Sequence, residues 1–117
     1  MTQQYVGTKQ VTAWEQEKDL QPGYAVKYED GYISWSPKAV FEAAYLSLGH
    51  IGHLPAHAQR VVAERAQLAD KLAKLNKFLG GDHSAQLLAV DRELLQLQAH
   101  QMGQYLRTLD LRLERMQ

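Results

Sequence analysis

Two stretches in the C-terminal half of the chain carry apolar residues at a seven-residue spacing. In the last stretch, Ser84–Gln117, the two interleaved series are Leu88, Leu95, Met102, Leu109, Met116 and Ala99, Leu106, Leu113. In the preceding stretch, Pro55–Leu79, they are Val61, Leu68, Leu75 and Arg65, Leu72, Leu79. Such spacing places one narrow apolar stripe, which we call the seam, on each of two α-helices. Because each seam needs a partner helix along its length, the pattern predicts an antiparallel helical hairpin.

The ends of these helices coincide with residues that commonly stop or start a helix. Gly80 and Gly81 predict the end of the first helix, since glycine accepts the left-handed conformation of a C-cap. Asp82 and Ser84 are candidate N-caps for the second helix. Apolar residues off the seam of the last helix are Leu94, Leu97 and Leu111. They leave apolar surface to bury between chains, which predicts at least a dimer.

The first third of the chain has the alternating, aromatic-rich pattern of β-strands. We predict strands at Tyr5–Trp14, Tyr24–Tyr28 and Tyr32–Trp35, with a hairpin turn at Asp30-Gly31. A sheet of three short strands is too small to be stable alone, so it must pack on helices. Its aromatic residues cannot all be buried on one face, so some are expected to meet a partner chain or a flat ligand.

The helix that covers this sheet is predicted at Pro37–Leu48, with Ser36 as its N-cap. Its sheet-facing residues are expected to be Val40, Phe41, Ala44 and Leu48. The predicted fold class is therefore α+β, with a small N-terminal antiparallel sheet and a short helix, followed by a long C-terminal helical hairpin. Residues 1–49 are expected to form the β-rich unit and residues 50–117 the hairpin, within one compact domain overall.

Composition and charge narrow the classes of function. Hydrophobic residues make up 45% of the 117 residues and charged residues 22%, which is ordinary for a folded soluble chain. Thirteen basic residues balance thirteen acidic ones, so there is no general electrostatic case for binding DNA or a membrane. Neither a signal peptide nor a transmembrane run is visible. Together with the absence of cysteine, this favours a cytoplasmic protein.

No motif for catalysis accompanies this pattern. The sequence has no glycine-rich phosphate loop, nucleophile elbow or paired carboxylate–histidine arrangement. His50, His53 and His57 lie in and after a glycine-containing linker, and histidine is a zinc ligand. No carboxylate completes the set nearby, so a polar linker is the simpler interpretation. We expect a binding protein rather than an enzyme, with no metal and no cofactor.

Polar residues share a face on each helix of the predicted hairpin. On the last helix they are Gln98, Gln101, Tyr105, Thr108, Arg112 and Arg115, and on the first they are Arg60, Gln67, Lys71 and Lys74. Such faces offer amide donors, an aromatic ring for stacking and guanidinium groups for phosphate. The alternative is a solvated surface with ordinary ion pairs, such as Arg60 with Glu64 or Asp70 with Lys74. Spacing alone favours this alternative.

Blocks of sequence spread over nearly the whole chain resemble one known family. In the N-terminal part they are Tyr5–Lys9 (YVGTK), Gly23-Tyr24, Asp30–Lys38 (DGYISWSPK) and Val40–Glu42. In the hairpin they are Gln59–Val62 (QRVV), Asp70–Leu75 (DKLAKL) and an ending with Met102, Tyr105, Leu109, Arg112 and Leu113. Together they resemble the first-described family of phage Thoeris anti-defence proteins, which share a C-terminal helical hairpin with the phage anti-CBASS cyclic-nucleotide sponge.

The resemblance implies a sponge that sequesters a nucleotide second messenger in the bacterial cytoplasm without cleaving it. For this family the messenger is a cyclic ADP-ribose isomer, and the implied assembly is a hexamer built as a trimer of dimers. The implied messenger site comprises Gln98, Gln101, Tyr105 and Arg112, with Trp14 or Trp35 closing over them. If the extra sites of related sponges are retained, Arg60, Lys71 and Lys74 would face cyclic di- or trinucleotides.

One segment departs from the family pattern. Family members usually carry a longer segment with aromatic and arginine residues between the first two strands, whereas here it is only Glu15–Pro22 and has neither. Ligand contacts that family members make from that segment therefore cannot be assigned to residues of this chain. The alternative function is a protein-binding adaptor or inhibitor that acts through its hairpin, with the polar stripes solvated and the aromatic residues at an interface.

Overall fold

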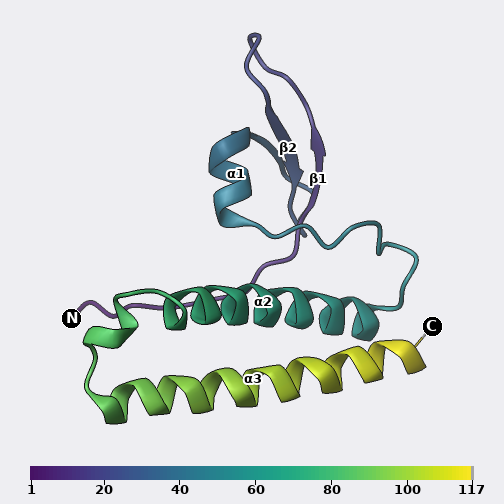
Figure 1. Ribbon diagram of the computed structural model, residues 1–117. Coiled ribbons are helices and arrows are strands. Elements are labelled where there is room, and N and C mark those ends of the chain that lie inside the picture. The colour runs from purple at the N-terminus through teal and green to yellow at the C-terminus, as the bar shows by residue number, and fades with distance from the viewer. Residues whose placement is uncertain (117) are drawn as a thin grey trace. The chain divides into compact units, whose positions relative to one another are not determined.

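The computed structural model describes residues 1–116 and confirms the α+β fold class (Figure 1). The elements in chain order are β1 (Thr12–Glu15), β2 (Gly23–Lys27), β3 (Ile33–Pro37), α1 (Lys38–Ala44), α2 (Ala56–Leu79), the 3₁₀ turn η1 (Ser84–Gln86) and α3 (Ala89–Arg115). They divide into two compact units, Met1–Leu46 and Ser47–Gln117. The predicted end of the last helix at Gln117 lies outside the described residues.

The three strands form one antiparallel sheet in the order β1-β2-β3. In one row of the sheet Trp14 pairs with Ala25 and Ala25 with Trp35, and in the next row Glu15 pairs with Tyr24. Residues paired across antiparallel strands point to the same face, and successive residues alternate. The two tryptophans therefore lie on one face of the sheet, and Tyr24 lies on the other.

The first predicted strand, Tyr5–Trp14, is wrong over its N-terminal part, because β1 begins only at Thr12. Thr12 pairs with Lys27, which is the last residue of β2. After Lys27 the chain turns toward β3, and the Gly31 N–H donates to the Tyr28 carbonyl oxygen at 2.9 Å. Residues before Thr12 consequently have no opposite strand in this sheet. The second and third predicted strands closely match β2 and β3.

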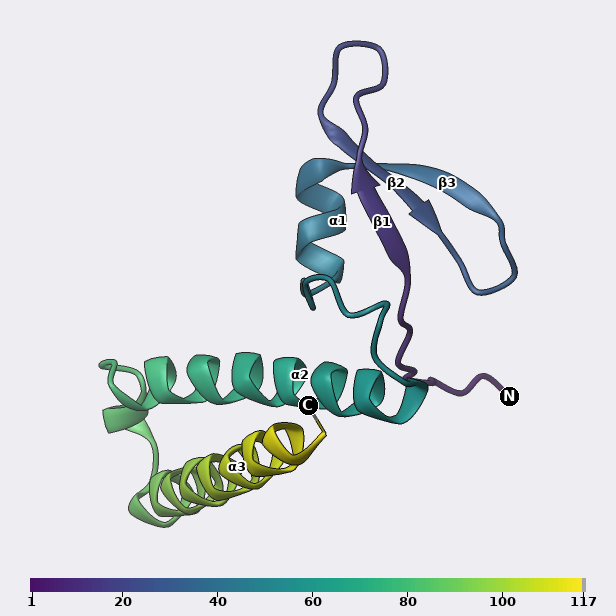
Figure 2. The same ribbon diagram turned by 90° about the vertical axis from the view of Figure 1, so that its right-hand side faces the viewer.

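Helix α1 lies against the Tyr24 face of the sheet (Figure 2). The Tyr24 ring stacks on Phe41 with 4.5 Å between ring centroids, and Phe41 stacks on Tyr45 at 4.8 Å. The Tyr24 hydroxyl donates to the Glu42 carboxylate at 2.8 Å. Val26 points to the same face and is 1% exposed. The packing between α1 and the sheet is therefore mainly a half-buried aromatic stack beside the buried Val26.

Helix α1 is shorter than the predicted Pro37–Leu48, because Tyr45 already has extended backbone angles, φ −130° and ψ 142°. The prediction that Ser36 caps it is wrong, since Ser36 lies within β3 and no side chain caps the helix. Of the residues expected to face the sheet, Phe41 packs there. The others are exposed or lie beyond the helix: Val40, Ala44 and Leu48.

The other face of the sheet is organised by both tryptophans. Ala25 lies between them and is 3% exposed. The Trp35 indole N–H donates to the Gln16 carbonyl oxygen at 2.7 Å, and the Trp14 indole N–H donates to the Gln16 side-chain oxygen at 3.2 Å. Gln16 therefore positions both rings, while Trp14 remains 43% exposed.

We expect Gly23→Ala to destabilise the sheet unit. A Cβ at this position would lie 2.3 Å from Cζ2 of Trp35 and 2.5 Å from the Ser36 carbonyl oxygen. Overpacking of this kind typically costs about 1–3 kcal/mol. Both tryptophans of the chain are in this unit, so urea unfolding followed by tryptophan fluorescence reports on it. Gly7→Ala is the control, since a Cβ there meets no atom within 4 Å, and equal midpoints for the two variants would contradict the packing.

Helices α2 and α3 run antiparallel, side by side, as predicted (Figure 1). Leu109 is 0% exposed, Ala58 1% and Val61 5%. The remaining seam residues are half-buried: Arg65, Leu68, Leu72, Leu75, Leu79, Leu95, Ala99, Met102, Leu106, Leu113 and Met116. The seam is therefore confirmed, except at Leu88, which is 72% exposed because it precedes the first residue of α3.

One polar pair crosses the hairpin at the seam. Arg65 forms an ion pair and an N–H hydrogen bond with the Asp110 carboxylate on α3. Both side chains remain partly accessible, 41% and 46%, so the pair is worth at most about 1 kcal/mol of stability. Its main consequence is positional, because it fixes how α2 and α3 are aligned along their axes.

The turn between the helices differs from the prediction. Gly80 ends α2 without the left-handed conformation, since its φ is −84°. Ser84 is not an N-cap of α3 but is 3% exposed, and its hydroxyl lies 3.0 Å from the carbonyl oxygens of Leu79 and Gly81. No side chain caps α3, so the prediction for Asp82 is also wrong. Because Ser84 closes the preceding helix, α3 starts five residues later than expected, at Ala89.

Candidate functional site

The predicted messenger-binding residues of the hairpin lie together on α3. Gln98, Gln101, Tyr105 and Arg112, which we call the polar stripe, occupy one exposed face, and Tyr105 is 45% exposed. The Gln98 amide nitrogen lies 3.8 Å from the sulfur of Met102, which leaves its amide oxygen open. The stripe therefore presents amide groups, a phenol ring and a guanidinium group to the same side, which suits a polar ligand with flat and anionic parts.

Arg112 is the strongest anion-binding candidate in this stripe. In the simplest alternative it pairs with Asp110 or Glu114, but Asp110 pairs instead with Arg65 on α2. Across residues 1–116 the ion pairs are Arg65–Asp110 and Lys74–Asp70. Arg112 thus has no carboxylate partner in the part of the chain that the structure describes, and its donors remain available to a phosphate.

Basic residues on α2 form a second exposed set, which we call the basic stripe: Arg60, Lys71 and Lys74. Lys74 is 2.9 Å from the Asp70 carboxylate, as the solvated-surface alternative predicted, so its charge is partly compensated. The Arg60–Glu64 pair of that alternative is not among the ion pairs of residues 1–116. Arg60 and Lys71 consequently offer the less compensated charges.

Trp14 and Trp35 belong to the other unit, Met1–Leu46. Trp35 is half-buried, and the Lys18 ammonium lies 5.6 Å from the centroid of its ring. Both indole N–H groups are already bonded to Gln16. A ligand on this face would therefore meet ring surface, mainly that of Trp14, rather than an N–H donor.

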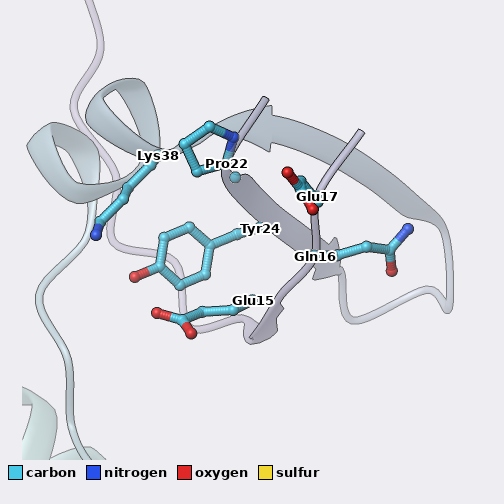
Figure 3. A pocket seen from close by; sticks show the side chains of 7 residues that line it. Glu15, Gln16, Glu17, Pro22, Tyr24 and Lys38 are labelled. Atoms are coloured by element: carbon cyan, nitrogen blue, oxygen red, sulfur yellow. The ribbon is translucent and has the colours of Figure 1, made fainter. Parts of the chain in front are cut away.

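An open pocket of about 290 Å³, which the sequence did not reveal, lies at the end of the sheet (Figure 3). Its lining consists of Glu15, Gln16, Glu17, Pro22, Gly23, Tyr24 and Lys38. In Figure 3 the Glu15 carboxylate and the Tyr24 hydroxyl point toward the same side. Because carboxylates outnumber the single lysine, this pocket is poorly suited to a phosphate group.

The hydrogen bond that Tyr24 donates to Glu42 raises the pKa of Tyr24 above its usual 10.0, with desolvation and the nearby carboxylates acting in the same direction. Because the folded-state pKa is raised, the contribution of this bond to stability is present below pH 10 and is lost as the pH rises through the raised pKa. Strand register brings Glu15 beside Tyr24, so sequence spacing alone could not identify this pocket.

Two further features concern metals and membranes. In the described range 1–116, no three His, Cys, Asp or Glu residues are grouped so that they could hold a metal ion. The helices of the same range include none with the length and apolar character needed to cross a membrane.

Comparison with known proteins places the hairpin in a family. A family model described as Sequestin matches residues 55–115, just over half of the chain. The matched region comprises α2, η1 and α3, and so includes both the polar stripe and the basic stripe. No curated protein and no solved structure matches the chain. The family match confirms the resemblance to sequestering anti-defence proteins that was inferred from the sequence.

Proposed function

This chain belongs to the Sequestin family, and we propose that it binds and sequesters a cyclic ADP-ribose-type signalling nucleotide made by the bacterial Thoeris system. The observation that carries the proposal is the polar stripe of α3, which is exposed along its length and contains an arginine without a carboxylate partner within residues 1–116. The stripe lies in the part of the chain that the family model matches.

The residue types of the polar stripe suit each part of such a messenger. The molecule carries an adenine, two riboses and a diphosphate. The Arg112 guanidinium can bond two phosphate oxygens at once, the amides of Gln98 and Gln101 can bond ribose hydroxyls, and the Tyr105 ring can stack on the base. A tryptophan of the sheet unit, Trp14 or Trp35, is proposed to close over the ligand. The zero net charge is no obstacle, because two phosphates need only a local positive group.

Sequestration requires tight binding without chemical change, so that the effector of the defence system never receives its signal. By resemblance, the protein acts for a phage in the cytoplasm of the infected bacterium and assembles as a hexamer. The same resemblance suggests that cyclic di- or trinucleotides occupy a separate site at the basic stripe.

The proposal is tested by recovering the bound ligand. The protein is incubated with a panel of signalling nucleotides, separated from free nucleotide, and then denatured by heat, and the released molecules are identified by liquid chromatography and mass spectrometry. Intact cyclic ADP-ribose isomer in stoichiometric amount is the expected result. A converted product would instead indicate an enzyme. Absence of every nucleotide would favour the adaptor function.

Lys71→Ala is expected to weaken binding of cyclic di- or trinucleotides, because it removes an exposed charge from the basic stripe. Loss of one such phosphate contact typically lowers affinity about tenfold. Binding of the ADP-ribose isomer should not change, since Lys71 is on α2 rather than α3. Calorimetric titration with both ligands measures the two effects. Lys77→Ala is the control on the same helix, and equal loss of both ligands in Lys71→Ala would argue against two separate sites.

A further inference from the structure

The two faces of the small sheet differ in charge. Lys18 pairs with Gln21 in the same register that joins β1 to β2, so strand alternation extends into the turn. Glu15 and Glu17 therefore lie on the face of Tyr24. The opposite face, which we call the tryptophan face, consists of Thr12, Trp14, Gln16, Lys18, Gln21, Gly23, Ala25, Lys27, Ile33, Trp35 and Pro37. It carries two lysines and, among these described residues, no carboxylate.

The positive charges of the tryptophan face have no carboxylate partner in the chain as described. Neither Lys18 nor Lys27 takes part in an ion pair of residues 1–116. Helix α1 packs on the other face through Phe41, and Trp14 stays 43% exposed and Ile33 52% exposed. An open surface that combines aromatic rings with uncompensated ammonium groups suits a flat ligand that carries phosphate.

The two indole rings differ in how much surface a ligand could reach. Trp35 packs against the backbone of β2, because a Cβ on Gly23 would lie 2.3 Å from its Cζ2 atom. The Lys18 ammonium lies over the same ring, 5.6 Å from its centroid. Lys27 is the diagonal neighbour of Trp14 across the strand pair, which corresponds to about 7–8 Å between Cα atoms. Trp14 is therefore the better stacking platform, and a lysine lies beside each ring.

We propose that the tryptophan face receives the nucleotide in the sheet unit, with Trp14 stacked on the base and with Lys18 and Lys27 binding phosphate oxygens. This assignment rests on the proposed function, since it takes the sequestered nucleotide as its ligand, and it selects Trp14 over Trp35. Stacking on an aromatic ring and contacts from basic side chains are the usual means of binding bases and phosphates without a deep pocket. The opposite face is unsuited, because its carboxylates repel phosphate.

Gln16 is assigned the role of a positioning residue for Trp14. Its backbone carbonyl oxygen accepts the Trp35 indole N–H at 2.7 Å, whereas its side-chain oxygen accepts the Trp14 indole N–H at 3.2 Å. In Figure 3 the Gln16 side chain points away from Tyr24 and Glu15. Trp35 is thus held by backbone and packing, while the orientation of the Trp14 ring depends on one side chain. A ring that is held before the ligand arrives loses less freedom on binding, which raises affinity.

Trp14→Ala is expected to lower the affinity for the cyclic ADP-ribose isomer about tenfold or more, because it removes the stacking of one base on an aromatic ring. Trp14→Phe keeps a ring and is expected to retain most of the affinity. Calorimetric titration measures both, and melting temperature confirms that both variants fold. Normal affinity of folded Trp14→Ala would overturn this assignment and leave the proposed function intact, whereas a wild-type protein that binds no nucleotide would overturn both.

Gln16→Met tests the positioning role, since methionine has nearly the same length but lacks the amide oxygen. Affinity is expected to fall about twofold to tenfold, the effect of releasing one ordered side chain. In ¹H–¹⁵N spectra the indole signal of Trp14 should shift and that of Trp35 should not, because the backbone carbonyl remains. The spectrum of Trp14→Phe assigns the two signals, and Gln4→Met is the control at an exposed position. A shifted Trp14 signal with unchanged affinity would overturn the positioning role.

The double variant Lys18→Gln/Lys27→Gln tests the charges of the tryptophan face. Its affinity for the same isomer is expected to be about tenfold lower, because phosphate contacts are lost. Lys9→Gln/Lys38→Gln is the matched control, since the Lys9 ammonium lies over the Tyr28 ring, 4.9 Å from its centroid, and Lys38 lines the pocket at the end of the sheet. Equal affinity of the two double variants would overturn the assignment of phosphate to the tryptophan face.

Discussion

Leu109→Ala is expected to lower the free energy of unfolding of the hairpin by about 2–5 kcal/mol. Leu109 is 0% exposed and is the largest fully buried side chain of the described hairpin. Removing it loses the transfer free energy of the buried atoms and leaves a cavity that two rigid helices close only in part. Because few other residues in this unit are fully buried, the loss is a large share of the packing energy between α2 and α3.

The matched control is Leu88→Ala, which makes the same chemical change at a position that is 72% exposed. Its expected effect is within about 0.5 kcal/mol, as for most surface substitutions. Urea unfolding followed by circular dichroism at 222 nm measures both variants, at one protein concentration because assembly adds to apparent stability. Similar losses for the two variants would contradict the assignment of Leu109 to the centre of the seam.

The helical hairpin could be predicted from the sequence because its signal is local and repeated. Residues seven apart lie on one face of a helix whatever surrounds it, so spacing alone assigns Leu68 and Leu109 to the seam. The helix ends could not be predicted in the same way. Ser84 has the chemistry of an N-cap, yet its hydroxyl reaches back to the Leu79 carbonyl oxygen. The chemistry of serine permits both roles, and the path of the turn after α2 places its hydroxyl beside the Leu79 and Gly81 carbonyl oxygens.

The strands were predicted less well for a related reason. The segment before Thr12 has the composition of a strand, but a strand also needs an opposite strand of matching length, and β2 ends at Lys27. Pairing of this kind depends on residues far apart in the chain. The same dependence explains why the pocket formed by Glu15 and Lys38 was missed.

The candidate site was predicted in part. A helix fixes which of its residues share a face, so Gln98, Gln101, Tyr105 and Arg112 could be grouped by spacing alone. Whether Arg112 is neutralised could not be known from spacing, because an ion-pair partner can also come from another helix. The structure pairs Asp110 with Arg65 across the hairpin. Arg112 is in neither ion pair of residues 1–116, so it is available for an anionic ligand.

Arg112→Ala is expected to weaken binding of the cyclic ADP-ribose isomer by about 2–5 kcal/mol, which is about thirty-fold or more in affinity. The expected loss is large because the guanidinium group can bond two phosphate oxygens at once, and the diphosphate would be left poorly compensated. Ordinary exposed ion pairs contribute only about 0.2–1 kcal/mol, so a loss of this size is not expected from a solvated arginine. Calorimetric titration measures the affinity.

Two matched variants make the Arg112 result specific. Arg107→Ala removes the same charge from an exposed position of α3 outside the polar stripe, and it is expected to bind normally. Arg112→Lys keeps the charge but loses the planar fork, so an intermediate affinity is expected if phosphate is held by two hydrogen bonds. Melting temperature and oligomeric state are measured for each variant, because a change in folding or assembly would also lower the measured affinity. Normal affinity of Arg112→Ala in an intact assembly would remove Arg112 from the site, whereas lost affinity with normal melting and assembly would place it there.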